Sequence, residues 1–179
     1  MGAGRPVSQR SSAQRRPLGL FVVLAVGGLL LDVATKVLAV ARLDPQEPVR
    51  LLGGLLTLRL IRNPGAAFSQ GEGLAWLFAA AAVLVLAYVL VRLVPRLGHR
   101  GWAVALGLLC AGVAGNLVDR LFRTPGPMRG HVVDFFQLPY WPVFNVADMC
   151  ISTAAVMIVV LAVIRGLGVD GRPADGRER

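Results

Sequence analysis

The chain has 179 residues, of which 55% are hydrophobic and 16% are charged, and its formal net charge at pH 7 is +9. About a quarter of the residues in a typical soluble domain are charged, so this composition excludes an ordinary soluble domain and indicates a membrane protein. The positive charge would also suit a nucleic-acid-binding protein. The arginines, however, are distributed between apolar segments, and we expect no nucleic-acid partner.

The chain begins with a basic, polar tail over residues 1–17, which precedes an apolar segment. This order resembles a secretory signal peptide, but the apolar segment contains Asp32 and Lys36 and has no clear small-x-small cleavage site. We therefore expect a retained signal-anchor helix over residues 18–41. Asp32 and Lys36 are four residues apart and share one face of this helix, which predicts a structural ion pair.

The segment after this helix contains a strand signal and a turn. Residues 56–60 (LTLRL) alternate apolar and polar side chains, which predicts a short strand. The proline and glycines of NPGAAFSQGEG, residues 63–73, predict a turn. We expect a small β element on the outer membrane surface rather than a second domain.

Residues 74–91 form an uninterrupted apolar run of eighteen residues, long enough for a transmembrane helix. Two later apolar segments are interrupted by only a few polar residues. The sequence therefore predicts an all-α integral membrane protein with a small extracytoplasmic β element and four transmembrane helices, at residues 18–41, 74–94, 101–122 and 143–165. One membrane domain, residues 18–167, accounts for nearly the whole chain, and a polar cytoplasmic tail, residues 168–179, follows it.

The distribution of arginine predicts the orientation in the membrane. With four helices, both ends of the chain lie on one side, which holds eleven arginines against seven on the other. The positive-inside rule then places both termini in the cytoplasm.

Several polar side chains lie within the predicted helices, where an unpaired charge is costly. Asp119 and Arg120 could neutralise each other at a helix end, and the asparagines could form interhelical hydrogen bonds. Because successive helices alternate in direction, all of these groups fall in one layer in the outer half of the membrane. The layer comprises Asp32, Lys36, Asn116, Asp119, Arg120, Asn145, Asp148 and Ser152.

Asp134 and Asp148 are the acidic residues that pairing explains least well. They lie in GHVVDFFQLPYWPVFNVAD, residues 130–148, which contains no lysine or arginine. The aromatic side chains of this stretch fit an interfacial belt, which would place both carboxylates near the outer edge of the bilayer. Two close carboxylates share one proton, so that one can act as a general base and the other as a general acid.

The residue pattern offers few other chemistries. Cys110 and Cys150 lie inside predicted helices, His99 and His131 are isolated, and Ser152 has no evident basic partner. Chemistry by two carboxylates needs neither metal nor cofactor, and we expect none. The pattern alone favours an aspartic protease. A non-enzymatic membrane scaffold, in which acidic residues pair with arginines, and a proton or ion transporter stay open as alternatives.

Five motifs occur in order: DVATK (32–36), RNPGAAFS (62–69), AGNLVDR (114–120), GHVVDFF (130–136) and FNVADM (144–149). Over residues 18–165 this set resembles the lipoprotein signal peptidases (signal peptidase II) of bacteria. The resemblance implies an intramembrane aspartic endopeptidase of the inner membrane, with its active site at the outer face. Such an enzyme removes the signal peptide from prolipoproteins by cleaving before the diacylglyceryl-modified cysteine. The implied partners are diacylglyceryl-prolipoproteins and membrane lipid, and we expect a monomer.

The resemblance also implies roles for individual residues. Asp134 and Asp148 are the catalytic pair; Asp119 is an alternative to Asp134, less favoured because Arg120 offers it a partner. Asp134 and Asp148 are fourteen positions apart, and the segment that joins them would form a compact hairpin that brings the two carboxylates together. The implied supporting and substrate-binding residues are Asp32, Lys36, Asn63, Gly65, Asn116, Asp119, Arg120 and Asn145. Among these, Asn145 would fix Asp148, and residues 63–68 would lie in a β cradle over substrate and lipid.

Overall fold

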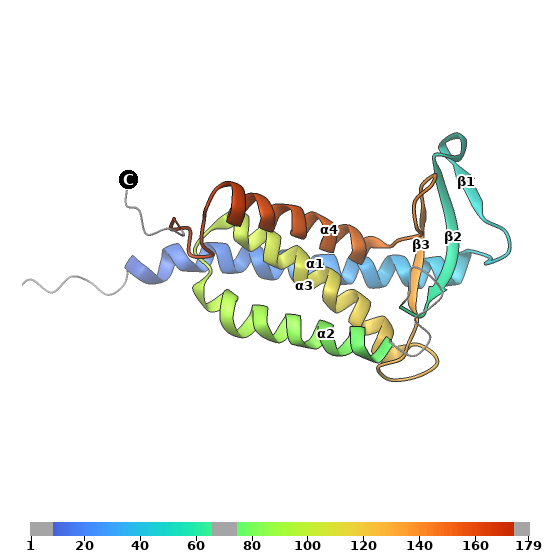
Figure 1. Cartoon of the computed structure of the whole chain (residues 1–179), viewed down its shortest axis with the longest axis horizontal. Helices are drawn as coiled ribbons and strands as arrows, with labels where there is room; N and C mark the ends of the chain where they lie inside the picture. The colour runs from blue at the N-terminus through green and yellow to red at the C-terminus, as the bar shows by residue number, and fades with distance from the viewer. Residues whose placement is uncertain (1–8, 66–74, 174–179) are drawn as a thin grey trace, which may run out of the picture.

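The computed structural model describes residues 9–65 and 75–173 of the chain. Within these residues, four helices are long and apolar enough to span a membrane: Pro17–Arg42, Ala75–Arg96, Arg100–Phe122 and Val146–Ile164. They run side by side, with a small β-sheet across one end of the bundle (Figure 1). The all-α membrane fold with a small β element is therefore confirmed.

The helices differ in detail from the predicted ranges. α1 (Gln9–Arg42) begins within the segment expected as a tail, because residues 9–16 are mostly good helix formers. α2 (Ala75–Tyr88) continues through a π-helical turn, Val89–Leu93, and a 3₁₀ turn, Val94–Arg96. α4 (Val146–Val159), followed by the π-helical turn Val160–Ile164, begins three residues later than predicted, because Asn145 caps it.

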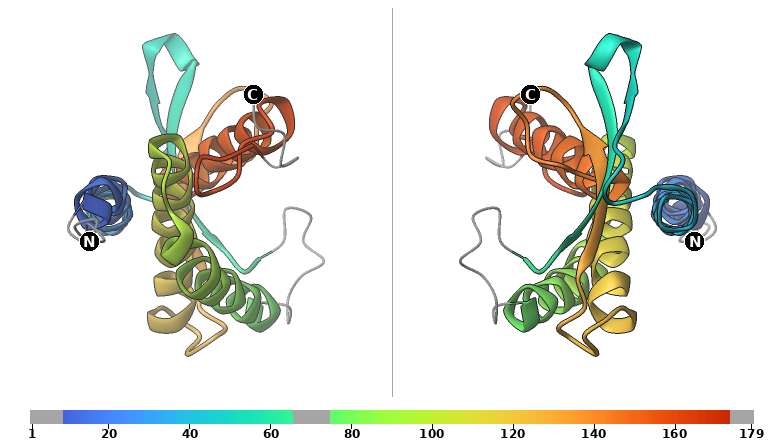
Figure 2. Two further views of the ribbon diagram at one scale, coloured as in Figure 1. Left: turned by 90° about the vertical axis from the view of Figure 1, so that its left-hand side faces the viewer. Right: turned by 90° about the vertical axis from the view of Figure 1, so that its right-hand side faces the viewer.

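α3 (Arg100–Phe122) is the central helix, with α1, α2 and α4 arranged around it (Figure 2). Of its membrane-spanning window 61% is buried, against 11% for α1 and α2 and 17% for α4. Small residues permit this close packing. A Cβ atom added at Gly112 would lie 2.4 Å from the carbonyl oxygen of Ala147, and one added at Gly115 would lie 2.3 Å from Oδ2 of Asp32.

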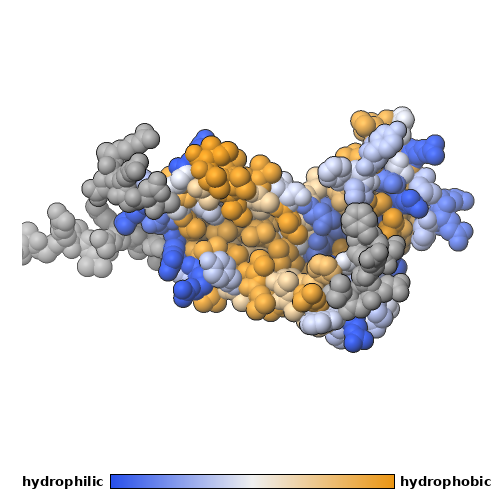
Figure 3. All heavy atoms as spheres, viewed as in Figure 1, coloured by the Kyte–Doolittle hydropathy of each residue, from blue (hydrophilic) through white to orange (hydrophobic). Residues whose placement is uncertain are grey.

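The outer surface of the bundle is apolar along the helices, and hydrophilic residues gather at its two ends (Figure 3). Large side chains of α1 such as Val23 and Leu30 are 67% and 62% exposed. In water such exposure would be costly, whereas in a bilayer these side chains face lipid. The surface thus supports a multi-pass membrane protein.

The sheet is antiparallel in the order β1 (Val49–Leu51), β2 (Leu56–Asn63), β3 (Val132–Gln137). β2 contains the predicted strand, residues 56–60, whereas β1 and β3 were not predicted. The pairing of Asn63 with Val132 and of Ile61 with Asp134 makes Asn63 and Asp134 diagonal neighbours. Ala39 of α1, Leu60, Val133 and Phe135 form a small apolar core beneath the sheet and hold it on the bundle.

The segment that follows α4 folds back onto the opposite end of the bundle. Trp102 donates from Nε1 to the carbonyl oxygen of Leu167 over 3.1 Å, and the backbone N–H of Gly98 donates to the carbonyl of Val169 over 3.1 Å. Residues 168–173, expected to belong to a polar tail, therefore contact the turn between α2 and α3 as far as the structure describes them.

Candidate active site

Polar side chains of α1, β2, α3, β3 and the start of α4 meet where the three helices reach the sheet. The sequence predicted one layer of polar groups, and the structure brings most of its members together there with Asp134, whereas Ser152 of that layer is exposed. Five of the residues at this place are nearly inaccessible to solvent, with exposures of 0% for Asp32, Lys36 and Asn145, 2% for Asp119 and 3% for Asp134. Burial of so many polar groups requires that each be hydrogen-bonded or ion-paired.

Asn145 connects Asp134 with Asp148. Its side chain accepts a hydrogen bond from the backbone N–H of Asp148 over 3.0 Å, and its own backbone N–H donates to Oδ2 of Asp148 over 3.1 Å. These reciprocal bonds form a capping box at the first turn of α4. The same asparagine donates from Nδ2 to Oδ1 of Asp134 over 2.6 Å. One buried residue thus contacts both carboxylates.

Asp134 lies on β3 with both carboxylate oxygens hydrogen-bonded. Asn63 donates from Nδ2 to Oδ2 of Asp134 over 3.0 Å, and Oδ1 of Asn63 accepts from the N–H of Gly65 over 2.9 Å. Burial, the largest effect, and the negative charge of Asp148 raise the pKa of Asp134 to about 6. The carboxyl group can therefore hold a proton under mildly acidic conditions.

Asp148 is half-buried and more accessible than Asp134. In addition to its bonds with Asn145, its Oδ1 accepts a hydrogen bond from Nδ2 of Asn116 over 3.0 Å. A shallow pocket of about 290 Å³ opens beside it. This pocket is lined by Trp141, Phe144, Asp148, Met149, Ser152 and Thr153. Asp148 is thus the member of the pair that faces accessible space.

Asp119 is held by cations, but not by the one expected. Its carboxylate lies 2.9 Å from Nζ of Lys36, pairs with Nε of Arg123, and accepts the N–H of Val133 over 3.1 Å. The expected pairing with Arg120 is wrong, because side chains of adjacent helix residues diverge, whereas residues four apart share a face. Lys36 also lies 2.8 Å from Asp32, which confirms the predicted pair on α1.

Arg120 lies between α2 and the carboxylates. Its Nη1 donates to the carbonyl oxygen of Asn116 over 3.2 Å, and its guanidinium carbon lies 5.6 Å from the ring centroid of Phe78. It also interacts electrostatically with Asp134, Asp119 and Asp148. A fixed positive charge therefore lies near the acidic pair without a direct hydrogen bond to either carboxylate among those that the structure describes.

Comparison with known proteins decides the family. The sequence profile of the family described as Signal peptidase (SPase) II matches residues 24–164. The chain belongs to the signal peptidase II family. It is 50% identical over 169 residues to the lipoprotein signal peptidase of Rhodococcus jostii (strain RHA1), covering 94% of this chain and 83% of that protein. It is 44% identical over 165 residues to that of Leifsonia xyli subsp. xyli (strain CTCB07), covering 90% of this chain and 76% of the relative.

Solved structures share the signal peptidase II fold found here. A bacterial membrane enzyme solved by the in meso method at 2.3 Å superposes with a TM-score of 0.69 at 22% sequence identity, covering 90% of this chain and 93% of that chain. A second, at 1.9 Å, has the same TM-score at 24% identity, with 81% of this chain and 93% of that chain covered. The bundle and its sheet are thus common to enzymes of distant sequence.

Sequence analysis missed some residues of this signal peptidase II site. Arg123 could have been found, because it lies four residues after Asp119 on the same helix. The bond from the N–H of Ala147 to Oδ1 of Asp32, at 2.8 Å, links α4 to α1 and has no sequence signal. Residues 66–68 of the predicted cradle lie outside the described residues.

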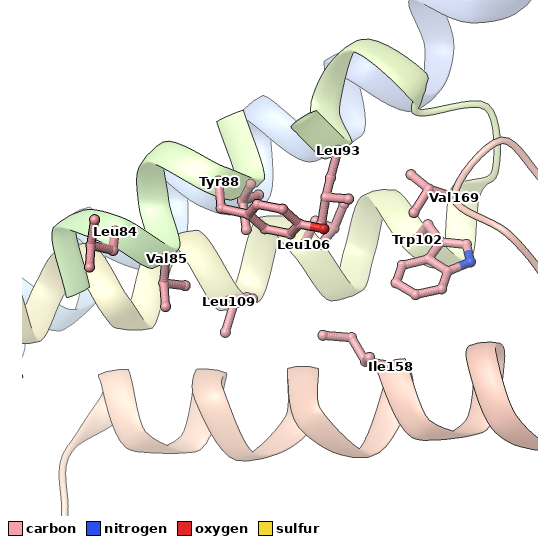
Figure 4. Close-up of a pocket in the computed structure, with 10 residues that line it drawn as sticks. Leu84, Val85, Tyr88, Leu93, Trp102, Leu106, Leu109, Ile158 and Val169 are labelled. Carbon is pink, nitrogen blue, oxygen red and sulfur yellow. The ribbon is translucent and has the colours of Figure 1, made fainter. Parts of the chain in front are cut away.

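An apolar pocket of about 440 Å³ lies between α2 and α4 (Figure 4). Leu84, Val85 and Tyr88 reach it from α2, and Ile158 from α4, while Trp102, Leu106 and Leu109 of α3 form its floor. Val169, from the segment after α4, lines its end. In this member of the signal peptidase II family the pocket offers room for an apolar chain within the membrane-spanning part.

Proposed function

We propose that this protein is an intramembrane aspartic endopeptidase that removes the signal peptide from prolipoproteins by cleaving before the diacylglyceryl-modified cysteine. Membership of the signal peptidase II family supports the substrate class. The connection of Asp134 to Asp148 through Asn145 is the observation that carries the aspartic mechanism.

Asp134 and Asp148 form the catalytic pair. Neither carboxylate makes a direct ion pair with another described residue. Asp134 is buried and Asp148 is half-buried, so Asp148 is better placed to contact a water molecule. Asp119 is unsuited to this chemistry because both of its carboxylate oxygens already have partners. Oδ1 pairs with Arg123, and Oδ2 contacts Lys36 and the N–H of Val133.

The pair shares one proton, and the raised pKa of Asp134 favours this residue as its carrier. Asp148 removes a proton from a water molecule whose oxygen attacks the scissile carbonyl carbon, while Asp134 donates its proton to the carbonyl oxygen. The gem-diol then collapses. A proton passes from Asp148 to the amine nitrogen, the C–N bond breaks, and a hydroxyl proton returns to Asp134. Both carboxyl groups end the cycle as they began it.

The sheet, beside which the polar site lies, is at the end of the bundle away from the start of α1 (Figure 1). The distribution of arginine along the sequence, eleven against seven, supports an orientation with both termini in the cytoplasm and the site at the outer face. The diacylglyceryl group then stays in the bilayer while the scissile bond meets water. The apolar pocket between α2 and α4 suits the hydrophobic segment of the signal peptide. A monomer contains all of these residues.

The test is cleavage of a diacylglyceryl-modified prolipoprotein by the purified protein in lipid. Asp134→Asn and Asp148→Asn should each reduce the rate about 100- to 10,000-fold, as expected for loss of a general acid or base. Asp119→Asn should retain partial activity. Asp44→Asn is the matched control, because Asp44 is an exposed aspartate beyond the end of α1. Full activity in Asp134→Asn with loss in Asp119→Asn would move the pair to Asp119 and Asp148.

A further inference from the structure

The ammonium group of Lys36 contacts two carboxylates and one neutral amide oxygen, although the carboxylates alone would balance its charge. Its Nζ lies 2.8 Å from Oδ2 of Asp32, 2.9 Å from Oδ2 of Asp119 and 2.9 Å from Oδ1 of Asn116. An ammonium group has three N–H donors and no acceptor. Its contact with Asn116 is a hydrogen bond, whereas its contact with Oδ2 of Asp32 is an ion pair without hydrogen-bond geometry. The two carboxylates account for the charge of this buried lysine. Its contact with the neutral Asn116 is therefore the one that a purely structural ion pair leaves unexplained.

The contact with Lys36 determines which way the Asn116 amide points. Because an ammonium group can only donate, the Asn116 atom that faces it must be the oxygen. Nδ2 of Asn116 then points away from Lys36 and donates to Oδ1 of Asp148 over 3.0 Å. The amide of Asn145 also faces Oδ1 of Asn116, at 3.3 Å.

We propose that Lys36 is a positioning residue for the catalytic pair: it holds Oδ1 of Asn116, and thereby presents the Asn116 N–H to Asp148. This inference rests on the proposed function of Asp148. Without the ammonium group, the Asn116 amide loses its stronger oxygen partner and can rotate by 180°. Its oxygen would then face the Asp148 carboxylate, and two acceptors repel each other. Asp148 would lose both a donor and a fixed position relative to Asp134.

Other charged groups around Asp148 do not replace this contact. Asp134, from β3, is an acceptor on the far side of Asn145, and Arg120, from α3, interacts with Asp148 only through its charge. Asp32 and Asp119 contact Lys36 itself. Among the described residues, Asn116 is the one side chain that contacts both Lys36 and Asp148. A second route runs from Lys36 through Asp32 to the backbone N–H of Ala147, and the comparison with Asp32→Asn separates the two.

The experiment must remove the ammonium group without leaving a buried carboxylate unpaired. Asp32→Asn/Lys36→Met removes both charges of the pair, and Asp119 keeps Arg123. Asp32→Asn alone is the matched control, because it leaves the contact between Lys36 and Asn116 in place. Relative to this control, the double variant should lose roughly 10- to 100-fold in kcat with little change in KM, as loss of a hydrogen bond to a charged group implies.

Adding Asn116→Ala to both proteins completes a double-mutant cycle. If Lys36 acts through Asn116, replacing Lys36 should change kcat less than about threefold once Asn116 is gone. A full, additive loss would overturn the proposal. Leu97→Ala, which shortens a buried side chain in the turn between α2 and α3 at the opposite end of the bundle, serves as a destabilised control with unchanged kcat.

A spectroscopic readout separates this proposal from the proposed function. The side-chain amide signals of Asn116 in a ¹⁵N–¹H spectrum should move in Asp32→Asn/Lys36→Met and stay in place in Asp32→Asn. Unmoved signals in the double variant would overturn the role of Lys36. Cleavage that persists in Asp148→Asn would instead refute the catalytic pair, while the amide signals still report the contact between Lys36 and Asn116.

Discussion

Asn145 donates to Oδ1 of Asp134 over 2.6 Å while it caps the helix that carries Asp148. The two contacts use different parts of one side chain, because Nδ2 serves Asp134 and Oδ1 serves the backbone N–H of Asp148. The relative position of the two carboxylates therefore depends on a buried residue whose own backbone is fixed by the start of α4. The contact within the proposed catalytic pair and the helix cap thus meet at this residue, and substitution can separate them.

Asn145→Ser should keep the helix cap and lose the contact with Asp134, because a serine hydroxyl accepts at an N-cap but is too short to reach β3. Asn145→Ala should lose both. We expect both variants to lose at least about tenfold in kcat, and only Asn145→Ala to lose a further 1 kcal/mol or so of stability through the missing cap. Cleavage rates and thermal unfolding in detergent measure the two effects. Equal activity of Asn145→Ser and wild type would show that the contact with Asp134 is dispensable.

The activity should depend on pH through Asp134. Burial and the charge of Asp148 raise its pKa to about 6, and the proposed mechanism requires its protonated form. Therefore kcat/KM, which reports the free enzyme, should fall about tenfold per pH unit above pH ~6. A pH series with a fixed prolipoprotein substrate measures this fall in activity. Asn63→Ala removes a hydrogen bond that favours the ionised form of Asp134, so in this variant the fall should begin at a higher pH. A flat profile between pH 5 and 8 would contradict Asp134 as the acid.

The stability of the protein should also depend on pH through Asp134. The pKa of this group is about 6 in the folded protein and near its ordinary value of 3.8 in the unfolded chain. The folded protein therefore binds more protons between these values, so the contribution of Asp134 is fully present below pH ~4 and is lost as pH rises through about 6. The difference amounts to about 3 kcal/mol. Thermal unfolding of Asp134→Asn, which cannot titrate, should show a weaker decline over this range and greater stability than wild type at pH 7.

Asp119→Asn should have the opposite effect on stability. This substitution removes a buried anion from between Lys36 and Arg123, and breaking a buried ion pair costs about 3 kcal/mol or more. The unfolding temperature should fall at pH 7, whereas that of Asp134→Asn should rise. Thermal unfolding of the two variants side by side provides the measurement. If both substitutions changed stability in the same direction, the assignment of one aspartate to structure and the other to chemistry would fail.

Much of the fold follows from local sequence, because apolar runs of membrane-spanning length allow few alternatives. β3 was missed although Val132, Val133, Phe135 and Phe136 favour strands, since its partner β2 lies about seventy residues away in the chain. The chain does fold back after β3, as the hairpin prediction required, through bonds between Phe136 and Phe144.

The prediction of an interfacial aromatic belt was only partly right, because the pairing of β3 with a strand far away in the chain buries one of its aromatic side chains. Tyr140 and Trp141 are exposed, as a belt requires, but Phe135 is 5% exposed and packs beneath the sheet. In the site, the residue types and their common layer were predictable from helix spacing. The partners of Asp119 and the bond from Ala147 to Asp32 depend on how α1, α3 and α4 meet, which spacing along one helix does not determine.

Gly115 offers a test of how closely the site depends on helix packing. A methyl group at this position would lie 2.3 Å from Oδ2 of Asp32, which is paired with Lys36 and whose other oxygen accepts the N–H of Ala147. Gly115→Ala must therefore displace Asp32 or separate α1 from α3, at a cost of about 1–3 kcal/mol. Because Asp32 supports the start of α4, cleavage should be lost together with stability.

Gly27→Ala is the matched control, since a Cβ at Gly27 meets nothing within 4 Å and alanine favours the helix. Thermal unfolding and cleavage should be unchanged in Gly27→Ala and both reduced in Gly115→Ala; an unaffected Gly115→Ala would show that the contact between α1 and α3 tolerates expansion.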